Sequence, residues 1–173
     1  MSSLIVKNVF RIILLILVQV LIFKQVNLGG PDFNYFQIMI YPLAILLLPI
    51  DVPKPLVLLI AFAIGMIVDI FYDSPGLHAA SLVFMAFLRP VVLRMLMPDT
   101  GYVKNSYPVA SMFGLVWYLQ YSGILLLAFF LAYFSLEAFT PIYFGSILLK
   151  TLLSFLVSFV TIILHQIIIN PKS

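Results

Sequence analysis

The sequence predicts an all-α integral membrane protein with six transmembrane helices, and three observations predict it. Only 9% of the 173 residues are charged, whereas about 25% are charged in an average soluble domain. Long apolar runs fill almost all of the chain between short polar breaks. A hydrocarbon core about 30 Å thick needs about 20 helical residues, so the chain has room for five or six crossings and for no second domain.

The apolar runs give the expected helices of this single domain, which extends over residues 1–173. The helices span about residues 9–26, 36–50, 56–72, 77–97, 109–136 and 142–169. The joins between them are rich in Gly, Pro and Asp, which form turns. The second segment is short and contains Pro42. It is either a tilted crossing or a discontinuous helix beside a site, and we favour the tilted crossing.

The first segment resembles a signal sequence, because Lys7 and Arg11 precede its apolar stretch. No small-residue cleavage pattern follows it, so we expect an uncleaved first crossing.

The positions of the cations predict the orientation of the six helices in the membrane. With the N-terminus in the cytoplasm, the inner side holds Lys7, Arg11, Lys54, Arg94, Lys104 and Lys172. Lys24 alone lies clearly outside, and this positive-inside bias predicts that both termini are cytoplasmic. A re-entrant second segment would remove the bias.

Several classes of site are disfavoured by the sequence. There is no cysteine, which removes disulfides and cysteine-based metal sites. The two histidines, His78 and His165, fall near opposite membrane faces and cannot share a metal. No phosphate-binding glycine-rich loop occurs, and no basic patch with interleaved aromatics indicates nucleic acid. We therefore expect no enzyme activity, no cofactor, no metal and no nucleic-acid partner.

The most informative polar residue is Asp69, in the middle of an apolar run. A carboxylate at membrane depth costs about 2.5–3.5 kcal/mol, so it normally faces protein or water. Ala61, Gly65 and Asp69 are four residues apart and share one helical face. Small residues on that face allow another helix to approach closely. The pattern predicts that Asp69 points into the bundle and not at lipid.

Lys150 is the expected partner of Asp69. It lies about eight residues into the sixth segment, which places it about 12 Å below the outer surface, and a lysine side chain can extend toward the interface. Glu137 is a nearby competitor for Lys150. The Asp69–Lys150 pair would either bind a partner or ligand or fix the packing of the helices.

Arg89 and His78 are two further candidates. Arg89 lies nearer the inner side, where it either anchors the fourth helix at the headgroups or contacts another protein. Pro90 beside it removes a helix hydrogen bond and predicts a kink. His78 follows the outer turn, where we expect a polar cap or, alternatively, a functional residue.

Residues 65–80, GMIVDIFYDSPGLHAA, resemble the hallmark segment of the MreD family of bacterial rod shape-determining membrane proteins. That family shows Gly-x-x-x-Asp in its third helix, then a small turn and Gly-Leu-His-Ala at the start of the fourth. The size, the six expected crossings, the cytoplasmic termini and the short loops also agree.

The resemblance implies a non-enzymatic scaffold of the cell-wall elongation machinery in the bacterial cytoplasmic (inner) membrane, which binds MreC and helps to maintain rod shape during peptidoglycan synthesis. RodA, its penicillin-binding-protein partner and MreB are further implied partners, beside membrane lipid. The implied fold is similar to the substrate-binding subunit of energy-coupling-factor transporters. Candidate partner or pocket residues are Ala61, Gly65, Asp69, Asp73, Gly76, His78, Arg89 and Lys150.

The alternative function is a small-molecule, vitamin-type binding subunit of a membrane transporter. A ligand site should present several convergent polar groups in a cavity. Few polar side chains are expected at membrane depth in this sequence, which favours the scaffold.

Overall fold

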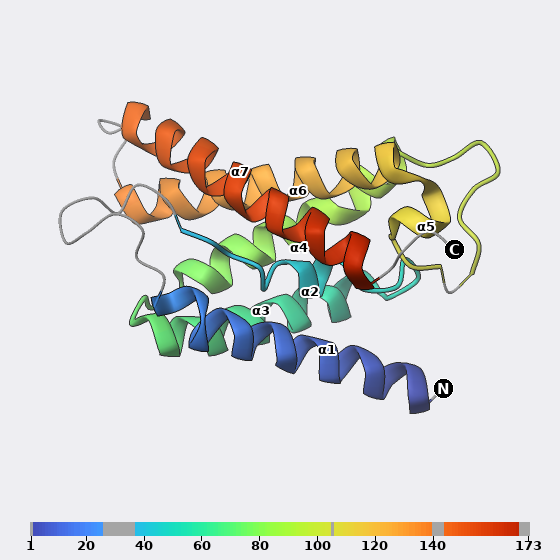
Figure 1. Cartoon of the computed structure of the whole chain (residues 1–173), viewed down its shortest axis with the longest axis horizontal. Coiled ribbons are helices and arrows are strands. Elements are labelled where there is room, and N and C mark those ends of the chain that lie inside the picture. The colour runs from blue at the N-terminus through green and yellow to red at the C-terminus, as the bar shows by residue number, and fades with distance from the viewer. Residues whose placement is uncertain (1, 26–36, 105, 140–143, 170–173) are drawn as a thin grey trace.

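The computed structural model describes residues 2–25, 37–104, 106–139 and 144–169, and the side chains of residues 9–24, 37–104, 106–139 and 144–166. All regular structure in these ranges is helical (Figure 1). The long helices are α1 (Ser2–Leu21), α3 (Lys54–Tyr72), α4 (Leu77–Met95), α6 (Leu115–Ala138) and α7 (Phe144–Ile169). The short ones are η1 (Phe23–Gln25), α2 (Leu43–Leu46) and α5 (Ala110–Phe113).

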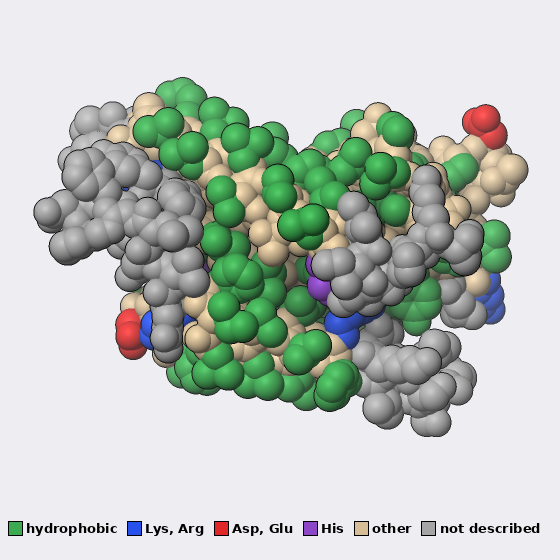
Figure 2. Space-filling view, in the orientation of Figure 1, with side chains coloured by type: hydrophobic (Ala, Val, Ile, Leu, Met, Phe, Trp, Pro, Cys, Tyr) green, Lys and Arg blue, Asp and Glu red, His purple; other side chains and the backbone are tan. Residues whose placement is uncertain are grey.

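Four helices are long and apolar enough to cross a membrane: α3, α4, α6 and the part of α7 from Phe144 to Gln166. The apolar part of α1, Val9–Leu21, is shorter. Figure 2 shows hydrophobic side chains over much of the face that carries α1 and α7, and the acidic side chains visible there lie at its two ends. An apolar band between charged ends is the distribution that a lipid-facing surface requires. The chain is therefore a helical, multi-pass membrane protein.

Residues 37–50 do not form the single helix expected at about 36–50. Residues 37–40 are extended, a turn follows, and Pro42 then occupies the N-cap position of α2, which is one turn long. Every side chain from Met39 to Leu48 is buried. The expectation of one continuous helix over residues 36–50 was wrong, and the segment is discontinuous. An apolar run that is buried on all sides has no periodicity to distinguish helix from extended chain.

The long helices surround residues 37–50. The hairpin of α3 and α4 packs against α6 through α4, α7 packs on α6, and α1 contacts both α2 and α3. Figure 1 shows residues 37–46 running between α1 on one side and α7 on the other. At the centre, the ring of Tyr41 meets the ring of Phe129 edge-on with 5.8 Å between centroids.

The fifth segment also differs from its expected form, and the fourth does not. The fifth segment, expected at 109–136, is divided into α5 and α6 at Gly114, whose φ of +89° is a conformation that glycine adopts without strain. The fourth helix continues through Pro90 to Met95, in agreement with the segment expected at 77–97.

Candidate functional site

The side chain of Asp69, in α3, accepts hydrogen bonds from the first turn of α4. Its Oδ1 accepts a hydrogen bond from the backbone N–H of His78 at 2.9 Å, and its Oδ2 accepts one from the N–H of Ala79 at 3.0 Å. The N-cap position of α4 itself is Gly76, which has no side chain. The Asp69 carboxylate therefore caps the N-terminus of α4 from the neighbouring helix, in place of an N-cap side chain. Its negative charge also lies at the positive end of the α4 dipole.

Two side chains complete the surroundings of this carboxylate. The hydroxyl of Ser74 donates to Asp69 Oδ1 at 3.1 Å. The Nδ1 atom of His78 lies 3.0 Å from the same oxygen and 2.9 Å from Ser74 Oγ. Asp69 is 4% exposed and His78 is 1% exposed. These partners of Asp69 lie in the turn after α3 and in the first turn of α4.

Gly65 brings the two helices of the hairpin into contact one turn below Asp69. A Cβ atom added at Gly65 would lie 2.3 Å from Cα and 2.7 Å from the backbone nitrogen of Ala79. Only glycine leaves room for that approach. Ala61, Gly65 and Asp69 are all buried on the same face of α3, which confirms that Asp69 points into the bundle.

His78 lies in the core of the bundle and not at its surface. Its ring is surrounded by those of Tyr41, Tyr72 and Tyr133, with centroid distances of 5.8, 4.9 and 4.9 Å. Among the described residues, none forms a hydrogen bond with His78 Nε2. We expected the His78 side chain to be a polar cap at the outer turn. This expectation was wrong, because the imidazole is buried inside the bundle.

The expected Asp69–Lys150 pair is not formed. Lys150 Nζ lies 3.3 Å from Glu137 Oε2, with the two side chains 31% and 32% exposed, so the competitor named above is the partner. The oxygens of Asp69 instead accept hydrogen bonds from α4 and its turn. Asp73 and Gly76 have turn roles: both are left-handed, with φ of +52° and +88°, and they cap the end of α3 and the start of α4.

Arg89 forms a second buried polar centre on α4. It is 2% exposed, so its side chain does not lie at the surface of the bundle, where both of the alternatives expected from the sequence would place it. Its Nε donates to the hydroxyl of Tyr121 at 2.9 Å, and its Nη2 donates to the carbonyls of Leu48 at 2.5 Å and Pro49 at 3.3 Å. Tyr121 in turn donates to the carbonyl of Leu46 at 3.0 Å.

Arg11 of α1 is the hydrogen-bond donor for the remaining carbonyl at the end of α2. Its Nη2 donates to the carbonyl of Leu47 at 2.9 Å. The carbonyls of residues 46, 47, 48 and 49 therefore each accept a side-chain hydrogen bond. Non-helical backbone at membrane depth is tolerated only when it is buried in protein or lines a water-filled cavity, and these side chains meet that requirement.

The extended residues before α2 are held by α1 and α7. Gln19 accepts from the N–H of Ile40 at 2.8 Å and donates to the carbonyl of Ile38 at 3.0 Å. The hydroxyls of Ser154 and Ser158 accept from the N–H groups of Gln37 and Met39 at 2.9 and 3.0 Å.

The roles of Gln19, Ser154 and Ser158 were not predicted from the sequence. A signal was present, because Thr151, Ser154, Ser158 and Thr161 recur at helical spacing in an apolar segment. Hydroxyl residues in such a stripe commonly hydrogen-bond across helices. Here Ser154 and Ser158 bond to the backbone of residues 37 and 39, whereas Thr161 donates to the carbonyl of Val157 in its own helix.

The described polar centres are built from backbone and neutral side-chain partners, apart from the Asp69–His78 contact. No group of three or more His, Asp or Glu side chains in the described ranges could hold a metal ion. What the arrangement does is hold irregular backbone and a tight hairpin inside an apolar bundle. The chain as a whole matches no protein-family model, no curated protein and no solved structure.

Proposed function

We propose that this chain is a non-enzymatic membrane scaffold of the MreD type, which binds MreC in the cell-wall elongation machinery and helps to maintain rod shape. The proposal includes six crossings of the bacterial cytoplasmic membrane, with both termini in the cytoplasm. Residues 37–50 would provide the second crossing as an extended and one-turn helical segment.

The observation that carries the proposal is the α3–α4 hairpin. The residues that resemble the family's hallmark segment contact one another in this hairpin. Gly65 contacts the backbone of Ala79, and Asp69 accepts hydrogen bonds from the N–H groups of His78 and Ala79. A packing role accounts for the spacing of these residues without any turnover. It also yields a rigid platform, and helices in a membrane associate by packing such preformed surfaces.

Two of the described cavities are too small for a vitamin-type ligand. These two cavities have volumes of about 180 and 50 Å³. Pockets for small molecules usually measure about 300–1,000 Å³ and bury most of the ligand.

The experiment is mass spectrometry of the proteins that co-purify with a tagged chain extracted in native lipid discs. We expect MreC, together with RodA or its partner synthase. Recovery of transporter ATPases and their coupling subunit would overturn the proposal.

Cell width provides the matched functional test. Asp69→Asn should widen cells that depend on this chain, whereas Asp73→Asn, at an exposed position of the same turn, should leave the width unchanged at equal protein abundance. Normal width with Asp69→Asn would count against the scaffold role of the hairpin.

A further inference from the structure

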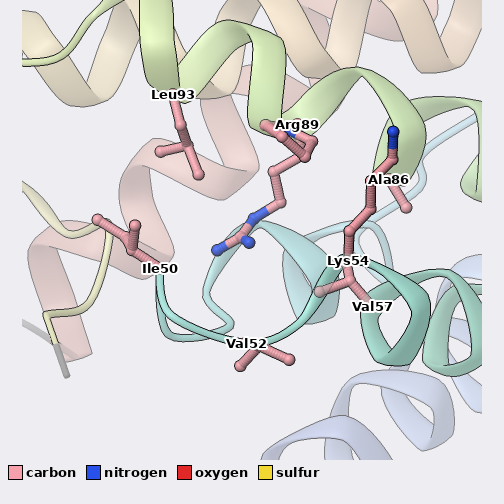
Figure 3. Close-up of a pocket in the computed structure, with 8 residues that line it drawn as sticks. Ile50, Val52, Lys54, Val57, Ala86, Arg89 and Leu93 are labelled. Atoms are coloured by element: carbon pink, nitrogen blue, oxygen red, sulfur yellow. The ribbon is translucent and has the colours of Figure 1, made fainter. Parts of the chain in front are cut away.

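A cavity of about 180 Å³ lies between the start of α3 and the last turns of α4. Ile50, Val52, Val57 and Leu93 give it apolar walls, and the two cations Lys54 and Arg89 also line it. Figure 3 shows the guanidinium of Arg89 extending from α4 into the space bordered by Ile50 and Val52. This cavity is separate from the hairpin contacts of Asp69, which lie at the other end of α3.

The cavity is positively charged and has no acidic lining residue. Arg89 is almost fully buried, and the acceptors of its hydrogen bonds are a hydroxyl and two carbonyls, which are neutral. In the part of the chain that the structure describes, neither Arg89 nor Lys54 is in an ion pair with a carboxylate. A buried charge without a counter-ion is costly, so an anion bound in this cavity would be stabilised by both cations.

Lys54 is the second cation that lines the cavity. It is exposed, and its Nζ lies 4.2 Å from the centroid of the Phe87 ring on α4. Lys54 is also the first residue of α3, whose N-cap Pro53 provides no side-chain cap. The positive end of the α3 dipole therefore adds to the attraction for an anion at this point.

The depth of the cavity corresponds to the membrane interface. Arg89 is six residues before the last residue of α4, Met95, which is about 9 Å along the helix. Lys54 begins the adjacent helix at this end of the bundle, and Arg94 lies in the last turn of α4. Basic pockets between transmembrane helices at this level bind the headgroups of anionic lipids.

We propose that this cavity binds the phosphate of an anionic phospholipid through its two cations, Arg89 and Lys54. The cavity admits the headgroup phosphate, and the acyl chains remain in the bilayer beside α3 and α4. The same chemistry would accept a free phosphate ion, so the test includes both sources.

The test is native mass spectrometry of the full chain in detergent during titration with phosphatidylglycerol. Arg89 also donates hydrogen bonds to backbone carbonyls, so its substitution would disturb the fold as well as the charge. The substitution is therefore made at Lys54, which is exposed. We expect Lys54→Gln to weaken binding about fivefold, the factor for about 1 kcal/mol from one basic residue near an anionic surface. Lys104→Gln is the matched control, because Lys104 is exposed and does not line the cavity, and it should bind as tightly as the wild type.

A second variant fills the cavity without changing its charge. Val52→Trp should reduce binding of phosphatidylglycerol, and undiminished binding would contradict the proposal. Equal weakening by Lys54→Gln and Lys104→Gln would show general surface attraction instead. Equal retention of phosphatidylethanolamine by the wild type would overturn the requirement for an anionic lipid. Binding of inorganic phosphate alone, with the same dependence on Lys54, would assign the cavity to a soluble anion.

Discussion

Gly65 and Ala79 bring the backbones of α3 and α4 into direct contact. The space that a Cβ of Gly65 would need lies 2.3 Å from the Cα of Ala79. Because the obstacle is backbone, a larger residue cannot be accommodated by rotating a side chain. The separation of α3 and α4 at the level of the hairpin is therefore set by the absence of one methyl group.

Gly65→Ala should destabilise the protein by about 1–3 kcal/mol, the usual cost of an overpacked interior. Gly123→Ala is its control on α6, because a Cβ there would lie 3.6 Å from the nearest atom, on the Phe159 ring, in ordinary contact. Alanine in a helix is otherwise more stable than glycine by about 0.5–1 kcal/mol. The midpoints of thermal unfolding in detergent should thus move in opposite directions, and a parallel shift would contradict the close-contact explanation.

Asp69→Asn should lower stability by about 1–3 kcal/mol, the penalty for a buried group left without a partner. The carboxylate uses one oxygen for His78 and the other for Ala79, whereas an amide would place an N–H group against one of these donors. Asp73→Asn is the control, because asparagine also adopts the left-handed conformation found there. Denaturant unfolding measures both, and equal stability of the two variants would show that the cap contributes little.

Arg89→Lys should cost at least about 1–3 kcal/mol, although it keeps the positive charge. A guanidinium presents several N–H groups in a fixed plane, whereas an ammonium is a point charge, so Lys cannot reach Tyr121, Leu48 and Pro49 together. Arg94→Lys, at an exposed position on the same helix, should change little. If both variants unfold at the same temperature, the charge of Arg89 matters and its geometry does not.

Gln19→Leu should destabilise the junction of α1 with residues 38–40. The substitution conserves size and leaves the N–H of Ile40 and the carbonyl of Ile38 without their partner, at about 1–3 kcal/mol for each group that stays unpaired. Gln120→Leu, at an exposed position of α6, is the control. Hydrogen exchange at Ile40 locates the effect, and exchange that does not accelerate would contradict it.

The sequence predicted the burial of Asp69 because small residues four apart identify the inner face of a helix. It did not predict the partners of Asp69. Estimates of depth suggested Lys150, but the actual partners include backbone N–H groups nine and ten residues further on, and no pattern of side chains identifies a backbone donor. The same reason applies to Arg89, whose acceptors include the carbonyls of Leu48 and Pro49.

The discontinuous structure of the second apolar segment was also not predicted from the sequence. From Met39 to Leu48 it is buried on every side, so its residues carry no contrast between a lipid face and a protein face. Pro42 was the one local signal of an interruption. The polar side chains that make the interruption possible lie far away in the sequence, and only the assembled bundle shows that Ser158 and Met39 are neighbours.

The hydrogen bonds of residues 37–40 also determine when the protein can be complete. Gln37 and Met39 bind Ser154 and Ser158, more than 100 residues later in the chain. During synthesis these backbone groups gain their hydrogen-bond partners only after α7 has been inserted. Final assembly of the middle of the bundle is thus tied to the insertion of α7, and a chain that stops before α7 leaves the N–H groups of Gln37 and Met39 without these partners.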